Sequence, residues 1–316
     1  MKQYLDLLQD ILDNGEEKDD RTGVGTRSVF GRSIRFDLRT SFPAVTTKKL
    51  AWKAVVSELL WFIEGSGDEG RLREILYGDR EAKTDHGVAK KTIWSDNANA
   101  PYWTPKAEYP GDLGRVYGVQ WRNWKTFTKT NSVVANKDTY WPGEVKTVGH
   151  LPAYVQTRKV DQLYDLIEGL KNDPNGRRHL LTAWNPGELD QMALPPCHVM
   201  SQFYVNKNKE LSCHMYQRSV DVFLGLPFNI ASYALLTCLI AQVCGYKPGE
   251  LIISTGDTHI YKNHVEQVKE QLSRAPMELP TLFTFPPIMD INKFTMDDIH
   301  LMDYKSHDTI KAEMAV

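Results

Sequence analysis

The chain of 316 residues has few of the features that quickly assign a sequence to a common class. It contains four cysteines and no C-x-x-C pair, which argues against a disulfide framework and against a zinc site. Lys and Arg number 38 against 40 Asp and Glu. The net charge of −2 therefore gives no general attraction for nucleic acid or anionic membrane, and any bound anion needs a local group of arginines.

Targeting and nucleotide-fold signals are missing as well. The first residues, MKQYLDLL, lack the apolar centre of a signal peptide, and no apolar run approaches the length that spans a bilayer. Gly23 and Gly25 lie in a loop, but no G-x-G-x-x-G follows a strand and there is no P-loop lysine. We therefore expect a cytoplasmic protein without a dinucleotide or nucleoside-triphosphate fold.

The composition, with 41% hydrophobic and 25% charged residues, is typical of a soluble globular protein that buries a large core. Periodicity predicts helices at 4–12, 51–64, 160–170, 229–245 and 261–272, and strands at 28–37, 179–184, 198–205, 211–218 and 251–254. Residues from about 65 to 159 are polar and irregular. We expect one domain over residues 1–316 with an enlarged, loop-rich insertion at about 65–159.

One cysteine has unusual surroundings. Cys197 follows two prolines, which fix the backbone, and it stands at the head of a predicted strand. Residues 206–209 then read as a hairpin loop of about four residues. If Val205 faces Glu210 across this loop, counting back along both strands puts Cys197 opposite Arg218.

A guanidinium beside a sulfur favours the thiolate, which is the nucleophilic form. Most cysteines of intracellular proteins simply pack in the core, and Cys213, Cys238 and Cys244 fit that interpretation. Cys197 is therefore the candidate for covalent chemistry.

Other polar residues stand in apolar surroundings. Glu58 lies within the predicted helix 51–64, where an unpaired carboxylate would be costly. The amide of Asn229 can donate and accept, which matches a pyrimidine edge, although capping of the next helix explains it equally well. His259 and Tyr261 would point the same way in extended backbone. His259 and His264 lack the spacing of a helical metal pair, so we expect no metal.

Three short segments carry arginines that could hold a phosphate. They are DRTG with Arg21, NGRRH with Arg177 and Arg178, and YQRS with Arg218. The planar guanidinium suits phosphate, and bidentate contacts fix its orientation. A solvated surface position is the competing interpretation for each of them, and it fits Arg218 least because Arg218 interrupts a strand-like run.

The chain resembles the thymidylate synthases in several segments. These are Asp20–Gly23, Glu58–Phe62, Arg177–Arg178, Leu194–His198, Tyr216–Asn229, Gly256–Tyr261 and Met314–Val316, in the order of that family. The resemblance covers nearly all of residues 1–64 and 160–316. It implies an α+β fold in which helices pack on a mixed, mainly antiparallel sheet whose other face forms a dimer interface.

The resemblance also implies a covalent mechanism. Cys197 would add to C6 of the uracil of dUMP, and C5 would then attack the one-carbon unit of 5,10-methylenetetrahydrofolate. Folate would serve as carbon donor and reductant, giving dTMP and dihydrofolate. Glu58 would organise water for proton transfer with His198 beside it, and Tyr117 would lie near the C5 proton.

The same resemblance assigns the binding residues. For dUMP they are Arg21, Arg177, Arg178, Arg218, Ser219, Asp221, Asn229, His259 and Tyr261. For folate they are Ile93, Trp94, Leu194, Asp221, Gly225, Phe228 and Val316, with closure of the terminus excluding water. Arg177 and Arg178 would come from the other subunit, which implies a homodimer with two shared sites. No membrane or nucleic acid is required.

The sequence departs from the family pattern in two places. Ser95, Asp96 and Asn97 follow Trp94 where an acidic residue and a second tryptophan are common, and Arg115 stands where proline is usual before Tyr117. A dUMP hydroxymethylase, in which water captures the one-carbon intermediate, is therefore the alternative. A non-catalytic nucleotide- or RNA-binding protein is a further alternative that the near-neutral charge does not support.

Overall fold

The computed structural model describes residues 1–20, 22–130, 146–148 and 151–313. Two of the predicted site residues, Arg21 and Val316, lie outside the described residues.

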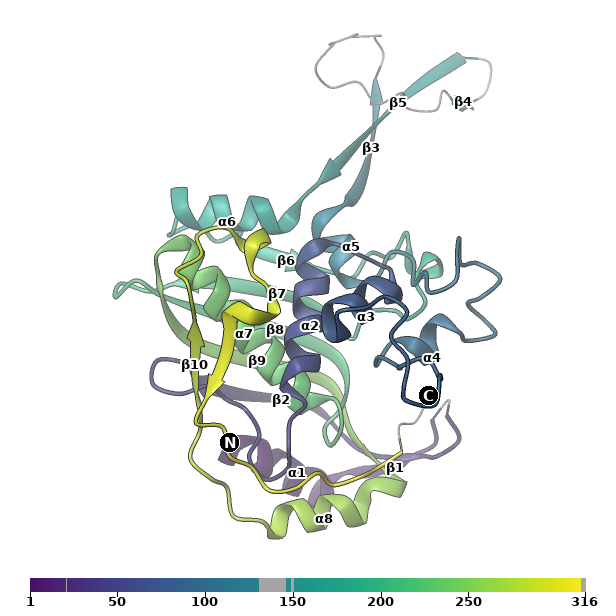
Figure 1. Ribbon diagram of the computed structural model, residues 1–316. Coiled ribbons are helices and arrows are strands. Elements are labelled where there is room, and N and C mark those ends of the chain that lie inside the picture. The colour runs from purple at the N-terminus through teal and green to yellow at the C-terminus, as the bar shows by residue number, and fades with distance from the viewer. Residues whose placement is uncertain (21, 131–145, 149–150, 314–316) are drawn as a thin grey trace.

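A six-stranded sheet forms the centre of the described chain (Figure 1). Its order is β1 (Glu16–Lys18), β2 (Thr26–Asp37), β9 (Lys247–Tyr261), β8 (Glu210–Asp221), β7 (His198–Val205) and β6 (Leu180–Thr182). Strands β8 and β9 pair in parallel, and the other neighbours are antiparallel. The predicted mixed, mainly antiparallel sheet is confirmed.

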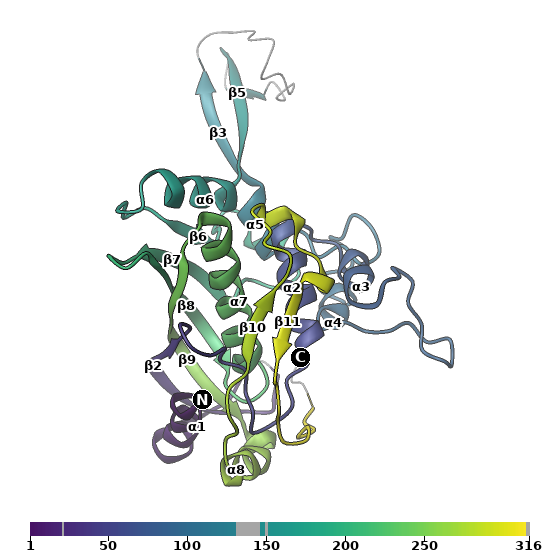
Figure 2. The same ribbon diagram turned by 60° about the vertical axis from the view of Figure 1, so that its left-hand side comes forward.

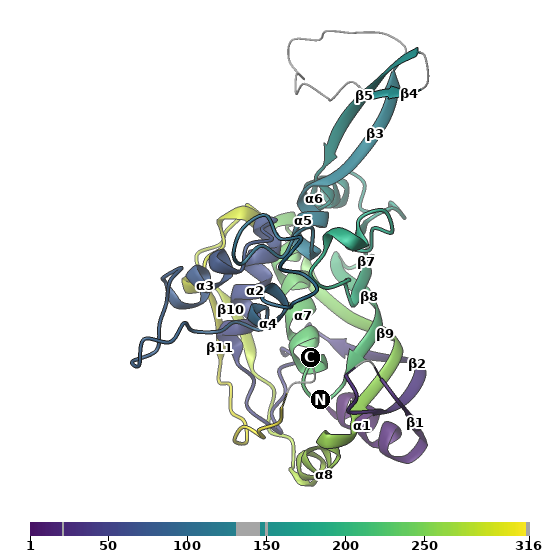
Figure 3. The ribbon, with the colours of Figure 1, turned by 90° about the vertical axis from the view of Figure 1, so that its right-hand side faces the viewer.

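Helices cover one face of this sheet. Helix α7 (Leu226–Cys244) packs on β8 and β9, and α2 (Trp52–Glu64) packs beside it. Because α7 is apolar around its whole circumference, it must be buried, and it forms the middle of the core. It is long and apolar enough to cross a membrane, but its burial between α2 and the sheet is that of a core helix. Figure 3 shows these helices on one side of the sheet.

The remaining helices and strands complete the body. Two strands, β10 (Thr281–Thr284) and β11 (Ile299–Met302), lie beyond α2 and α7 on the side away from the sheet (Figures 2 and 3). The other long helices are α1 (Lys2–Asn14), α6 (Gln162–Asn172) and α8 (Val265–Ser273). The fold therefore has the sheet, a helical layer and the small β10–β11 sheet in succession.

The opposite face of the central sheet carries exposed apolar side chains. Burial alternates along β7 and β8 as the pleat requires, and the outward positions include Met200, Tyr204 and Tyr216. Leu180 of the edge strand β6 pairs with Gln202 and is exposed as well. No described helix packs over these positions (Figure 3).

The predicted hairpin is present, but its register was wrong by one residue at the turn. Val205 pairs with Leu211, because the Asn206 N–H donates to the Glu210 carbonyl and Lys209 takes φ of 60°. A three-residue loop of this kind replaces the expected four. A bulge between His198 and Met200 then shifts the register back, so Cys197 does lie opposite Arg218.

Two predicted elements around strand β9 also need correction. The strand predicted at 251–254 is the 15-residue strand β9, because it pairs with β2 and β8 along both edges. The prediction stopped at residue 254 because polar residues follow it. Thr255 and Thr258 are nevertheless buried within the strand and hydrogen-bond one another. Helix α8 accordingly begins later than predicted, after a 3-10 turn at Lys262–His264.

The region predicted as an irregular insertion contains more regular structure than expected. It includes α3 (Glu69–Tyr77), α4 (Ser95–Ala98) and α5 (Tyr117–Arg122). After α5 come β3 (Trp124–Thr130), β4 (Lys146–Val148) and β5 (Leu151–Val160), paired in the order β3-β5-β4. These strands project from the body beyond α6 (Figures 1 and 2).

A short ladder connects the end of this region to the segment before Cys197. The Ala193 N–H donates to the Leu113 carbonyl at 3.0 Å, and the Arg115 N–H donates to the Gln191 carbonyl at 2.9 Å. Gly114, at the centre of the ladder, has φ of 69° and packs directly on Gln191. Only a residue without a side chain fits there.

Replacing Gly114 with alanine should therefore destabilise the protein strongly. The added Cβ would lie 2.2 Å from the Gln191 carbonyl oxygen, whereas at Gly78, with φ of 77°, a Cβ meets nothing within 4 Å. Gly78→Ala should cost about 1–2 kcal/mol for the left-handed backbone alone. Gly114→Ala should cost about 1–3 kcal/mol more for the overlap. Thermal melts of both variants test this prediction. An equal loss of stability in the two variants would show that the backbone around Gly114 shifts to accommodate the added Cβ.

Candidate active site

Cys197 is held by backbone hydrogen bonds on both sides of its Cα. Its N–H donates to the Tyr117 hydroxyl at 2.8 Å, and its carbonyl accepts from the Arg218 N–H at 2.9 Å. Tyr117 opens α5 with φ of 24°, a conformation that side chains seldom adopt. Residues 80 positions apart in sequence therefore meet at the sulfur-bearing residue.

The Arg218 guanidinium is fixed beside the sulfur. Its Nε donates to the Pro196 carbonyl and its Nη2 to the Pro195 carbonyl, both at 2.9 Å. Nη2 lies 3.9 Å from Cys197 Sγ, and the Trp184 ring lies 5.4 Å from the guanidinium carbon. Nη1 donates no hydrogen bond to the described residues, which leaves it able to bind an anion. The two prolines thus orient the Arg218 guanidinium as well as the backbone that leads into Cys197.

Arg218 favours the thiolate of Cys197, as expected, but burial has the larger effect in the protein without bound substrate. Burial raises the pKa of the Cys197 thiol, and the opposing effects of Arg218 and Tyr117 do not offset it. A contact at 3.9 Å is too long to replace the hydration that the sulfur loses. Cys197 is therefore a thiol at neutral pH in this state, with a cation in place to stabilise the thiolate when it forms.

Asn229 is oriented by a side chain rather than by a helix end. Its Oδ1 accepts from Gln217 Nε2 at 2.9 Å, and the same nitrogen donates to the Ser219 carbonyl at 3.2 Å. Helix α7 begins at Leu226, so Asn229 lies inside the helix and the capping explanation is wrong. With Oδ1 fixed by Gln217, the amide has one defined direction for its N–H groups.

His198 is buried between aromatic rings. The ring centroids of Tyr117 and Tyr233 each lie 5.2 Å from its imidazole. Burial lowers the pKa of His198 to about 4, although a hydrogen bond with Asn229 acts in the opposite direction. His198 is therefore neutral near pH 7 and serves as a hydrogen-bonding group rather than a cation.

Glu58 has the partner that its position in an apolar helix requires. Trp94 Nε1 donates to Glu58 Oε1 at 2.7 Å, and the Trp94 ring lies 5.7 Å from the Tyr117 ring. Burial raises the pKa of Glu58 to about 7, against the effect of the Trp94 hydrogen bond. Glu58, Trp94, Tyr117 and Cys197 thus form a continuous row of contacts, and Glu58 can both bind and release a proton near neutral pH.

The ends of β8 and β9 bring a second group together. Ser219 pairs with Asp257, and Asp221 pairs with His259. His259 Nδ1 hydrogen-bonds Asp257 Oδ1 at 2.8 Å, and the His259 and Tyr261 ring centroids lie 5.2 Å apart. The prediction that these two rings share one side of the strand is confirmed. Oδ1 of Asp221 accepts two backbone N–H groups of the turn into α7.

The remaining predicted residues are more dispersed. Leu194 and Phe228 are partly buried and pack on the core, and Gly225 is the residue before α7. Ile93 is exposed beside the buried Trp94. Asp96, one of the residues that depart from the family pattern, forms an exposed ion pair with Lys91.

Arg177 and Arg178 do not join the Cys197 cluster within this chain. They lie in the loop between α6 and β6, are exposed, and have no carboxylate partner among the described residues. The structure thus leaves both guanidinium groups available at the sheet edge.

Sequence reasoning missed three residues of the site. Gln217 sets the orientation of Asn229, Trp184 lies over Arg218, and Tyr233 packs on His198. Gln217 is an inward-facing amide in a strand with apolar inward neighbours, and that pattern could have revealed it. Nothing in the local sequence identifies Trp184 or Tyr233, because their partners are distant along the chain.

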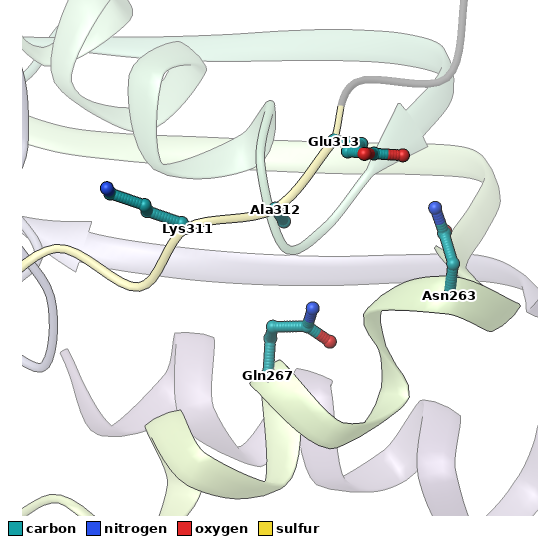
Figure 4. Close-up of a pocket in the computed structure, with 5 residues that line it drawn as sticks. All are labelled: Asn263, Gln267, Lys311, Ala312 and Glu313. Carbon is teal, nitrogen blue, oxygen red and sulfur yellow. The ribbon is translucent and has the colours of Figure 1, made fainter.

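One surface hollow lies apart from this cluster. It has a volume of about 430 Å³ and lies between α8 and the last described residues (Figure 4). Its lining residues are Asn263, Gln267, Lys311, Ala312 and Glu313, and they include no cysteine. Across the described residues, no group of three or more His, Cys, Asp or Glu side chains could hold a metal.

The raised pKa of Glu58 predicts how stability varies with pH. Between its ordinary value of 4.5 and about 7, folded Glu58 keeps a proton that the unfolded chain has released. Stability therefore falls as pH rises through this window. Glu58→Gln has no proton to lose at this position, so its stability does not fall in this window. The free energy of unfolding of the variant minus that of the wild type should therefore increase by up to about 3 kcal/mol between pH 4.5 and 7 and stay constant above that. Denaturant unfolding at several pH values measures it, and a constant difference would contradict the assignment.

The comparison with known families agrees with this geometry. The sequence model of the family described as Thymidylate synthase matches residues 2–316. The match includes the Cys197 hairpin and the whole 65–159 region. Members of this family are in general methyltransferases of nucleotide biosynthesis that bind dUMP and use folate. Since the match covers nearly the entire chain, the protein belongs to the thymidylate synthase family.

Proposed function

We propose that this protein catalyses the reductive methylation of dUMP to dTMP in the cytoplasm, with the whole chain acting as one domain. The observation that carries the proposal is the position of Cys197 Sγ, 3.9 Å from a guanidinium that two prolyl carbonyls orient. Such a cation stabilises the thiolate only as it forms, which is what a nucleophile with a raised pKa requires.

The first step is addition of Cys197 to the pyrimidine. The thiol loses its proton, a bond forms between Sγ and C6, and the electron pair of the C5–C6 bond moves toward C5 and O4. Asn229, oriented by Gln217, binds the uracil edge and discriminates it from a cytosine ring. Glu58, with its pKa of about 7, exchanges the protons that this step and the later loss from C5 require.

The folate contacts are part of the same proposal. 5,10-Methylenetetrahydrofolate supplies the one-carbon unit and the hydride, and dihydrofolate is the product. Asp221 keeps Oδ1 on two backbone N–H groups, and its Oδ2 accepts no hydrogen bond from the described residues. That carboxylate oxygen suits a heterocycle with N–H donors, and the partly buried Leu194 and Phe228 supply apolar surface for a flat ring. Trp94 limits the access of water to the site.

The phosphate and ribose contacts extend from β8 and β9. Nη1 of Arg218 and the Ser219 hydroxyl bind phosphate. Arg21, which lies outside the described residues, is proposed as a third phosphate ligand. His259, held by Asp257, and Tyr261 bind the sugar hydroxyl. Arg177 and Arg178 complete the phosphate site from a second subunit. Their exposure, with the apolar open face of the sheet beside them, supports a homodimer formed through that face.

Incubation with dUMP and 5,10-methylenetetrahydrofolate should yield dTMP and an increase in dihydrofolate absorbance. Cys197→Ala should abolish turnover while dUMP still binds, because the other contacts persist. Cys244→Ala is the matched control and should remain active, since within the described part of the chain Cys244 donates only to the Ile167 carbonyl. Formation of 5-hydroxymethyl-dUMP without dihydrofolate would establish the hydroxymethylase instead. Turnover by Cys197→Ala would refute covalent catalysis.

Mixing two inactive variants tests the shared site. Cys197→Ala and Arg177→Ala/Arg178→Ala should each be nearly inactive alone. After unfolding and refolding together, half of the dimers should contain one intact site, restoring about a quarter of the wild-type activity. Recovery of no activity, with dimers confirmed by sedimentation, would place both arginines in the site of their own chain or outside any site.

A further inference from the structure

Arg115 and Glu188 form a buried ion pair next to the active-site cluster. Arg115 Nε donates to Glu188 Oε2 at 2.5 Å, and both residues are at most 9% exposed. Arg115 Nη2 donates to the Asn123 carbonyl at 2.6 Å, at the end of α5, and Gln120 Nε2 also donates to Glu188. Although burial acts in the opposite direction, these hydrogen bonds hold the pKa of Glu188 below its usual value.

The pair joins the two segments that carry Tyr117 and Cys197. Residues 113–115 and 191–193 form the short ladder described above, and Arg115 donates its own N–H to Gln191 within it. The Arg115 side chain then reaches past the ladder to Glu188. Backbone and side chain of one residue therefore fix the segment before Tyr117 against the segment before Cys197.

Tyr117 needs such support because its backbone is strained. A φ of 24° is stable only where surrounding contacts impose it. The hydroxyl must nevertheless reach the Cys197 N–H at 2.8 Å. We propose that the Arg115–Glu188 pair is a positioning device that holds the Tyr117 hydroxyl on Cys197. Its effect on turnover rests on the proposed function, whereas its effect on Cys197 can be measured on the free protein.

The thiol itself provides the measurement. The Tyr117 hydroxyl lowers the pKa of Cys197, so loss of this contact should slow alkylation of the sulfur. The rate of iodoacetamide labelling, followed by mass spectrometry of the Cys197 peptide from pH 6 to 10, should be roughly three- to tenfold lower at neutral pH in Tyr117→Phe. Arg115→Met and Glu188→Gln should shift the profile in the same direction by no more than Tyr117→Phe.

A double variant separates positioning from general destabilisation. Arg115→Met/Tyr117→Phe should label at the rate of Tyr117→Phe alone, because the pair acts through that hydroxyl. The matched control is Arg32→Met, which removes an arginine that binds Asp10 and the Phe30 carbonyl. It should change the thermal midpoint without shifting the labelling profile. Arg115→Lys, which keeps the charge but loses the planar fork, should fall between wild type and Arg115→Met.

Three results would overturn the proposal. They are an unshifted profile in both Arg115→Met and Glu188→Gln, additive effects in the double variant, and an unshifted profile in Tyr117→Phe. If Arg115→Met does not fold, Glu188→Gln and its double variant with Tyr117→Phe decide in its place. Labelling needs neither dUMP nor folate, so failure of the proposed reaction and failure of this proposal are separate outcomes.

Discussion

The peptide unit of Cys197 is the constraint on which the rest of the site depends. Its N–H is taken by Tyr117 and its carbonyl by Arg218, so the sulfur has one position relative to both the helix α5 and the strand β8. The bulge before Met200 makes this possible, since without it the register of the hairpin would place Cys197 one residue out of step with Arg218. Because the two prolyl carbonyls that precede Cys197 then bind the Arg218 guanidinium, the nucleophile and its cation are positioned by the same few residues.

Burial, more than charge, sets the protonation state of this site. Desolvation raises the pKa of Cys197 and of Glu58 and lowers that of His198, so each group moves toward its neutral form. Arg218 is then the main fixed charge beside the sulfur. An arrangement of this kind suits a reaction in which negative charge develops during catalysis, because a preoriented cation acts on the charge as it appears. The neutral thiol of the free protein is thus compatible with a covalent mechanism.

Much of this could be predicted from local sequence, and the exceptions have physical causes. The Cys197–Arg218 pair could be predicted because strand alternation and a short polar loop are local signals. The register at the turn was predicted one residue out because nothing in the sequence indicates the left-handed backbone of Lys209, and the bulge between His198 and Met200 cancels that error at Cys197. The long strand β9 was underestimated because its buried threonines satisfy one another. The effect of Arg218 on the Cys197 thiol could be predicted because a facing arginine is visible in a sequence, whereas the larger effect of burial depends on packing from distant segments such as the one that carries Tyr117. The orientation of Asn229 by Gln217 required knowing where α7 begins.

Arg115 shows how a departure from a family pattern can be read once the structure is known. Where proline is usual at this position, its ring fixes φ and pre-shapes the segment before Tyr117, but it has no N–H to donate. Arg115 uses its N–H in the ladder to Gln191 and its side chain in the buried pair with Glu188. An arginine without these contacts would leave the strained backbone of Tyr117 free to relax, and a buried guanidinium without Glu188 would be costly. The substitution therefore makes physical sense only together with Glu188, Gln120 and the Asn123 carbonyl, which provide through hydrogen bonds the rigidity that a proline ring provides covalently.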